Sequence, residues 1–584
     1  MKAGLAKAVV SLSIISALFL GVGLAWADDP VALFNQAETL RQAGSFTAAI
    51  EKYVACMEGY HQAGQPTSSD ALESQKWVER LQTIKYELPL TYDQAKEYID
   101  EEIEQACPQS TPEQRQALRD EFLNAQNISR LYYDGQFHYL QQSELILNLL
   151  HRDFRLNNSL DLFGASTLPE ASNATFAKID QLIETHASRT EWDATLFDPI
   201  GMEMTVKVNI PSAQIPSSGD VEVWIPLALP DAFQDQVEIT YVSPEEYREC
   251  TTLTEVGNMY FKIPAAEIQG DVDIEVVFNW QRYQQRVVFS TDRVVGLWQY
   301  DPPSHTFSFA SLDQGFYTNY TQDTPNIVVS SAIRAKAFEI VEAYLAASGQ
   351  MTLNPYQCAR AIYDYMLANQ VYSHLPWATI NYLQRKSEWS ADGQGYIYDG
   401  LADDGQSIEE ARKIGLPVSE FVFNHGYGDC GALGAQYAAL CRAAGLPAVS
   451  TGGYQTIRGW GTASGHVWAA FYLPVYGWIL VDPSIGMIPE YLYLYGEYAG
   501  NEELYDQRTG FLFGGMDNYR LDLQDNMDRD ITPTPAITPS FTIVFQSPNY
   551  LIQERAPNEM PLCFYVTSTF EAEEMVLGAS GQGP

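Results

Sequence analysis

Cysteine is scarce in this chain, with only 7 in 584 residues. This low content excludes a scaffold held together by a dense set of disulfides. Cys56 and Cys107 form the one plausible pair, because both lie in a region of predicted helix. The odd total is consistent with one free, reactive thiol.

Basic residues are also few, with 34 Lys and Arg against 74 Asp and Glu, and the formal net charge is −40. Such an acidic chain is not suited to nucleic acid or to anionic membrane surfaces. The charge is typical of a soluble exported protein, although it is also compatible with cationic peptides or Ca²⁺. No Asp- or Asn-rich loop has calcium-site spacing. We therefore expect a peptide or protein substrate, no nucleic acid, and neither a cofactor nor a metal.

Only one apolar run is long enough to be considered as a signal peptide or a membrane anchor, and it extends from Ala8 to Leu24. Lys2 and Lys7 precede this run, and Ala25-Trp26-Ala27 follows it. A basic start, an apolar stretch and a small-x-small site predict a signal peptide over residues 1–27. We expect a secreted, cell-envelope or periplasmic protein. The alternative is an uncleaved membrane anchor, because the run is nearly long enough to span a bilayer.

A thiol in a reactive setting lies in the segment Gly426-Tyr427-Gly428-Asp429-Cys430-Gly431. The residues from Gly431 to Ala444 predict a helix, which places Cys430 at the helix N-terminus. The macrodipole there favours an anion, so we expect a thiol pKa below the usual range. Asp429 would oppose this effect, and we expect it to face away. The apolar residues of the helix form a single stripe, which consists of Leu433, Tyr437, Leu440, Cys441 and Ala444.

A histidine and an aspartate follow on two segments with strand patterns. Gly465-His466-Val467-Trp468 begins the first strand, and Gly477-Trp478-Ile479-Leu480-Val481-Asp482-Pro483 contains the second. If His466 lies directly opposite Asp482, the hairpin turn is centred on Pro474. Cys430, His466 and Asp482 then form a candidate catalytic triad of nucleophile, base and orienting carboxylate.

These motifs resemble the transglutaminase-like superfamily. The resemblance rests on the cysteine helix with Arg442-Ala443-Ala444-Gly445-Leu446-Pro447-Ala448, on Gly-His-x-Trp, and on Gly-Trp-x-x-x-Asp-Pro. It extends from about Asn354 to Ser484, and it implies a papain-like fold with a Cys-His-Asp site. It assigns Cys430 as nucleophile, His466 as base and Asp482 as orienter.

The oxyanion hole is less well defined than the triad. The backbone N–H of Cys430 is the natural first donor, since it lies at the helix end. The resemblance implies a second donor upstream, and Tyr372 matches its position, either as a donor or as a packing residue. Trp460, Trp468 and Trp478 either line an acyl tunnel or belong to the core.

The whole chain is predicted to be a multidomain α+β protein. A helical domain is expected over 28–190, where Ala37 to Tyr53 match one tetratricopeptide-like hairpin that serves either a protein partner or packing. Alternating patterns predict a β-sandwich-like domain over 200–300. The transglutaminase-like (papain-like) α+β catalytic domain follows over 303–525. Residues 526–584 form a Thr/Pro linker and a short β tail, in which Phe541–Phe545 and Pro561–Val566 are expected to add a hairpin to another domain.

Two functions are compatible with these features. The first is an exported cysteine peptidase, amidase or transglutaminase that acts on peptide or glutamine side-chain amides through a thioester. The second is an inert cell-envelope interaction protein that uses the same domain as a scaffold.

Overall fold

The structure is a computed structural model, and it describes most of the chain from Asp29 to Met575. The described residues are 29–65, 68–106, 111–124, 130–139, 170–187, 196–215, 219–372, 387–389, 396–398, 417–456, 464–487, 502–534, 544–546, 548–552 and 567–575. The predicted signal peptide and Cys107 lie outside them. Within these ranges no helix has the length and apolar character that crossing a membrane requires.

The N-terminal part begins with a helical hairpin, as the sequence pattern predicts. Helices α1 (Pro30–Gln42) and α2 (Phe46–Gln62) pack together through Ala37, Phe46, Ala49 and Tyr53, all of which are fully buried. The side chain of Asp29 caps α1 by accepting the Val31 amide. The other helices of this part are α3 (Ser69–Glu87), α4 (Tyr92–Ala106), α5 (Pro112–Asn124) and α7 (Glu170–Ala187).

This N-terminal part also contains short strands that the helical prediction did not include. The strands are β1 (Leu90–Thr91), β2 (Arg130–Tyr133) and β3 (Gln136–Tyr139). Strand β2 pairs in parallel with β14 (Tyr396–Tyr398), which itself pairs with β13 (Ser387–Trp389). Segments more than 250 residues apart in the chain therefore share one sheet.

Two antiparallel sheets follow, and they face each other across a shared core. Their strands include the three runs that the sequence predicts, seen as β4 (Leu196–Ile210), β5 (Asp220–Pro226) and β9 (Val272–Arg286). Inward-facing Val206, Val223, Phe261 and Val276 are fully buried between the sheets. The remaining strands of this part are β6 (Gln234–Ser243), β7 (Arg248–Leu253) and β8 (Gly257–Pro264).

The C-terminal tail completes both of these sheets. Strand β21 (Asn549–Ile552) pairs with β5, and strand β22 (Thr567–Met575) pairs with β4. Each of these two strands lies at the edge of its sheet. Pro561–Val566 and most of Phe541–Phe545 lie outside the described residues, so the expectation that these runs add a hairpin to another domain stays a prediction.

The third part combines helices with a four-stranded sheet of order β18-β17-β16-β20. The sheet strands are β16 (Ala448–Gln455), β17 (Ser464–Leu473), β18 (Gly477–Val481) and β20 (Arg520–Gln524). The helices are α8 (Gln314–Thr321), α9 (Ser331–Ser348), α10 (Pro355–Asn369), α13 (Val418–His425), α14 (Cys430–Ala443) and α16 (Glu502–Phe511). Short strands are β10 (Gln299–Asp301), β11 (Thr306–Ser308), β12 (Val371–Tyr372), β15 (Tyr427–Gly428) and β19 (Gly515–Met516).

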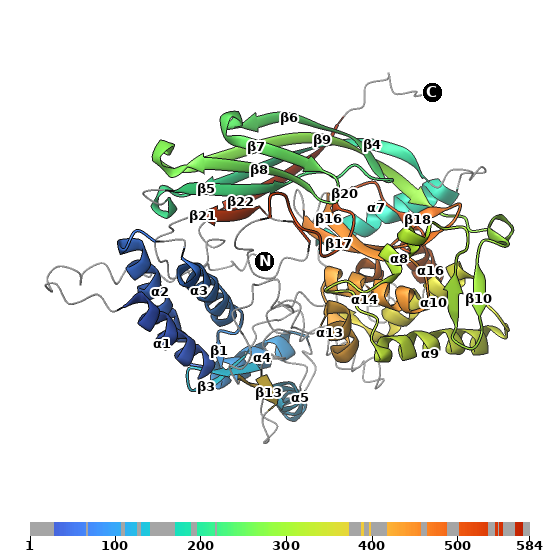
Figure 1. Cartoon of the computed structure of the whole chain (residues 1–584). Helices are drawn as coiled ribbons and strands as arrows, with labels where there is room; N and C mark the ends of the chain where they lie inside the picture. Colours follow the sequence, from blue (N-terminus) through green and yellow to red (C-terminus); the bar gives the residue numbers. More distant parts are fainter. Residues whose placement is uncertain are drawn as a thin grey trace, which may run out of the picture.

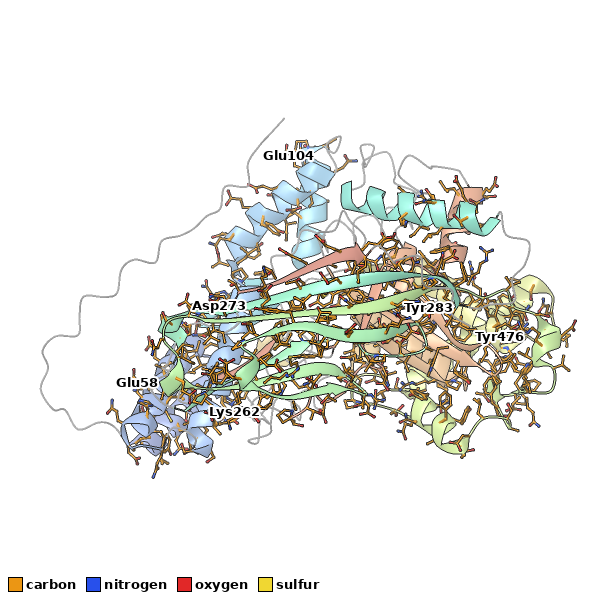
Figure 2. All side chains as sticks on the ribbon, turned by 90° about the horizontal axis from the view of Figure 1, so that it is seen from above. Glu58, Glu104, Lys262, Asp273, Tyr283 and Tyr476 are labelled. Atoms are coloured by element: carbon orange, nitrogen blue, oxygen red, sulfur yellow. The ribbon has the colours of Figure 1, made fainter. Side chains whose placement is uncertain are left out.

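The sheet of the third part is covered on both faces. Ala469, Phe471 and Ile479 face α14, while Trp468 and Leu480 face the opposite side. Figure 1 shows α14 on one side of β16 and β17 and the long strands β4 to β9 on the other. In Figure 2 the labelled Tyr476, from the β17–β18 turn, lies at the opposite end of the long strands from Lys262 and Glu58.

Helix α14 is a central helix, which corrects the prediction of a single apolar stripe. Every residue from Gly431 to Ala443 is buried, including Gln436 and Arg442. Arg442 is accommodated because its guanidinium donates to the backbone oxygens of Ala448 and Gln322. The helix that carries Cys430 is thus fixed on all sides.

We expect Gly445→Ala to lower the free energy of unfolding by about 2–5 kcal/mol. Gly445 ends α14 with φ +78°, and an added Cβ would lie 2.2 Å from the Phe307 backbone oxygen. That oxygen cannot move freely, because the neighbouring Phe307 amide donates to Ala444 O at 2.8 Å. Urea unfolding of the full chain measures the loss.

Gly349→Ala is the matched control for this substitution. Gly349 ends α9 with φ +67°, but no atom lies within 4 Å of an added Cβ. Only the backbone penalty applies there, so a loss of about 1 kcal/mol is expected. Equal losses for the two variants would contradict the close approach of Phe307 to α14.

Candidate active site

Cys430 is the first residue of α14, as the sequence predicts. Strand β15 leads into it and pairs in parallel with β12, which places Tyr372 opposite Gly428. A Cβ on Gly428 would lie 2.7 Å from the Ala432 Cβ and 3.0 Å from Val422 Cγ2. Only glycine therefore allows the chain to enter the helix at this angle. Cys430 as a whole residue is half-buried.

His466 and Asp482 are in direct contact, as the sequence predicts. His466 Nε2 lies 2.8 Å from Asp482 Oδ2, and both side chains are buried. An ionised carboxylate only accepts, so the Nε2–H of His466 donates here. Nδ1 is then the ring nitrogen that remains to accept a proton from a thiol.

The register of the hairpin differs from the prediction. Leu473 pairs with Gly477, so the turn is centred on Val475 and not on Pro474. Continuing this register would place Asp482 opposite Trp468, which makes His466 and Asp482 diagonal neighbours on one face. A histidine is long enough to cover that diagonal. Val475 adopts φ +75°, a conformation that is rare for a β-branched residue and that the sequence pattern does not predict.

The Asp482 carboxylate has donors on both of its oxygens. Oδ1 accepts from Ser484 Oγ at 2.8 Å and from the Ile485 amide at 3.0 Å. Oδ2 accepts from His466 and from Arg520 Nη1, the latter at 2.7 Å. Burial alone would raise the pKa of this carboxyl, but the charges of His466 and Arg520 hold it well below its usual range.

The thiol of Cys430 lies beside the strand that carries His466. The backbone amide of Val467, the next residue after His466, donates toward the Cys430 sulfur, and the Asp482 charge also acts on this thiol. The structure therefore places Cys430 next to the strand that carries His466, and His466 in contact with Asp482. The three residues come from the start of α14, from β17 and from the end of β18.

The protonation state of Cys430 differs from the expectation of a lowered pKa. Burial raises the pKa of this thiol, and the charge of Asp429 raises it further, against the amides of Val467 and Gly431. Asp429 does not face away. Its Oδ1 accepts the Ala432 amide at 2.8 Å, so it caps α14 and offsets the positive end of the helix. Burial and the Asp429 charge thus both favour the neutral form of the thiol.

The other candidate residues occupy different positions. Tyr372 is half-buried and packs against the main core, one strand away from the cysteine loop. Trp468 is fully buried, with its ring centroid 5.8 Å from that of His466. Trp478 packs on Phe316, Tyr320 and Tyr472 in an aromatic cluster. Trp460 lies outside the described residues.

Two residues at the site were not found from the sequence. Arg520, at the start of β20, contacts Asp482, and Gln546 of the tail donates to the His466 backbone oxygen at 3.0 Å. The Arg520-Leu521-Asp522 alternation is a possible strand signal, but nothing local indicates its partner. No group of three or more potential metal ligands occurs among the residues that the structure describes.

Comparison with known families covers the same part of the chain. Residues 344–483 match the model of the transglutaminase-like superfamily. This part of the chain is a transglutaminase-like domain. The match spans nearly the whole range over which the motifs carry the resemblance, and it includes Cys430, His466 and Asp482. No curated protein matches the chain.

Solved structures are similar only at low identity. A putative cysteine protease from Cytophaga hutchinsonii is 11% identical, covering 66% of this chain and 94% of its own, with a TM-score of 0.34. The periplasmic domain of TgpA from Pseudomonas aeruginosa is 15% identical, covering 53% and 92%, with a TM-score of 0.20.

Proposed function

We propose that this protein is an exported cysteine enzyme that breaks or exchanges amide bonds through a thioester. The observation that carries the proposal is the buried His466–Asp482 contact beside the Cys430 thiol. A surface histidine would need no such partner, whereas a general base needs one to fix its tautomer and orientation. The predicted signal peptide supports export to the cell envelope or periplasm.

Cys430 acts as the nucleophile and His466 as general base and acid. As the sulfur attacks the amide carbonyl, its proton passes to His466 Nδ1, and a carbon–sulfur bond forms. The imidazolium is stabilised by Asp482 and gives the proton to the departing amine as the carbon–nitrogen bond breaks. The Cys430 N–H, with Tyr372 as second donor, stabilises the oxyanion.

The acceptor decides between hydrolysis and transfer. Water regenerates the thiol and releases an acid, whereas an amine yields a new amide. We expect a peptide or protein substrate that supplies either a backbone amide or a glutamine side chain. No metal or cofactor enters these steps. The N-terminal helical hairpin is available for a protein partner.

Two substrates test the proposal with the full mature chain. Ammonia release from a blocked glutamine peptide, with and without a primary amine, reports on the side-chain reaction, and cleavage of labelled casein reports on the backbone reaction. Turnover of either substrate supports the proposal. Failure with both favours the scaffold function, which the raised thiol pKa and the Asp429 cap also permit.

The thiol should react as a neutral group at rest. Because burial and Asp429 raise its pKa, and only the thiolate is alkylated, iodoacetamide labelling of Cys430 should be slow at pH 7. Labelling should rise with pH and reach half its maximum above the value for a free thiol, about 8.5. Mass spectrometry of the Cys430 peptide measures it, with N-acetylcysteine as reference. Half-maximal labelling below pH 7 would instead indicate a preformed thiolate–imidazolium pair.

A further inference from the structure

Arg520 contacts the Asp482 carboxylate, which in turn contacts His466. Its Nη1 donates to Asp482 Oδ2 at 2.7 Å, and its Nε donates to Asp517 Oδ2 at 2.9 Å. All three side chains are almost completely inaccessible to solvent. Burying an arginine and two aspartates costs desolvation free energy unless the charges are paired and hydrogen-bonded in good geometry. A cluster of this kind therefore suggests a role beyond stability.

The donor arrangement fixes one orientation of Asp482. His466 and Arg520 share Oδ2, while Ser484 and Ile485 occupy Oδ1. Rotation of the carboxylate would break all four contacts together. The Arg520 guanidinium is itself held, because it lies 4.9 Å from the centroid of the Trp468 ring.

Arg520 also sets the charge at this position. The titratable groups that act on or face Asp482 come from four elements: His466 on β17, Arg520 on β20, Tyr363 on α10 and Cys430 on α14. Among these described groups only Arg520 carries a permanent positive charge. Burial lowers its pKa, but the charges of Asp517 and Asp482 raise it above its usual value.

We propose that Arg520 is a positioning residue that keeps Asp482 ionised and aimed at His466. The inference rests on the proposed function of the Cys430 site, but its geometry does not depend on which substrate is used. The side chain of Arg520 contacts Asp482, Asp517 and the Trp468 ring. It acts through Asp482, and its effect on catalysis should therefore vanish when that carboxylate is absent.

The test is Arg520→Met in the full mature chain, which keeps the length of the apolar stem but removes the charge. The low-field proton resonance of His466 Nε2–H reports on the bond to Asp482 without any turnover. We expect the pH at which this resonance is lost on acidification to rise by about one unit or more. With the glutamine peptide or casein, kcat should fall about 10²-fold with little change in KM, and the acid limb of its pH profile should rise equally.

Arg282→Met is the matched control. Arg282 is also fully buried, pairs with Asp522 of the same strand β20 and lies over the same Trp468 ring, at 5.9 Å. A merely structural role would give both variants the same behaviour. We expect Arg282→Met to lower stability while the His466 resonance keeps its pH dependence.

Two further variants keep the proposal testable if Arg520→Met folds poorly. Arg520→Lys retains the charge but cannot bridge Asp482 and Asp517 with one head group, so the pH dependence should recover and kcat only in part. In Asp482→Asn, adding Arg520→Met should lower kcat no further. Additive losses, or an unshifted His466 resonance in Arg520→Met, would overturn the proposal. Absence of turnover with an intact shift would refute the proposed function alone.

Discussion

The Cys430→Ala variant is expected to lose amide turnover by about 10⁵–10⁶-fold while it folds normally. The side chain supplies the nucleophile. Of the other described thiols, Cys56, Cys358 and Cys441 are fully buried, and Cys250 lies on β7, outside the transglutaminase-like domain. The half-buried Cys430 contributes little packing, so the loss of stability should be about 1 kcal/mol. The measurement is turnover of the substrate that the parent chain accepts, together with urea unfolding.

Cys441→Ala is the control for that experiment. It makes the same chemical change on the same helix α14, at a fully buried position. This variant should keep turnover but lose more stability, because it leaves a small cavity in a close-packed core. Turnover that survives in Cys430→Ala would show that another residue is the nucleophile.

The positions of the three candidate residues in the fold were predictable because their motifs are local. Cys430 at a helix start and His466 on a strand followed from periodicity, and Asp482 followed from a strand ending in Asp-Pro. In the structure Asp482 also accepts the Ile485 amide, with Pro483 as the first residue of the helical turn. Asp before Pro is a typical helix N-cap sequence, so one carboxylate both caps a turn and orients a histidine.

The features that were not predicted are interactions that the local sequence does not encode. Arg520 contacts Asp482 only because β20, which follows helix α16 in the chain, pairs with β16 in the same sheet. The tail strands β21 and β22 pair with β5 and β4, which lie more than 300 residues earlier. Strand pattern predicts that such segments pair, but not with which partner.

The pKa of the Cys430 thiol also depends on interactions that the local sequence does not encode. The helix N-terminus was read correctly as a favourable place for an anion. In the structure, that place is already taken by the Asp429 carboxylate, and the surroundings of the sulfur add the cost of burial. Competition between two anions at one helix end depends on rotamers, which the sequence does not specify.

Asp482→Asn is expected to lower kcat by about 10³–10⁴-fold, more than the loss of Arg520. Asparagine keeps the shape of the side chain but not the charge, so His466 loses both its fixed tautomer and the partner of its imidazolium. The variant also leaves the buried Arg520 with Asp517 alone. Breaking a buried pair from one side costs about 3–5 kcal/mol of stability at neutral pH.

The pH dependence of that stability loss identifies its cause. The pKa of Asp482 is lowered in the folded chain, so its ionised form stabilises the fold above the unfolded value of about 3.9. This contribution declines as the pH falls below that value and disappears only below the depressed folded pKa. The difference between wild type and Asp482→Asn, measured by urea unfolding at pH 7, 4 and 3, should therefore shrink on acidification. A difference that stays constant over this range would mean that the shape of Asp482, and not its charge, stabilises the site.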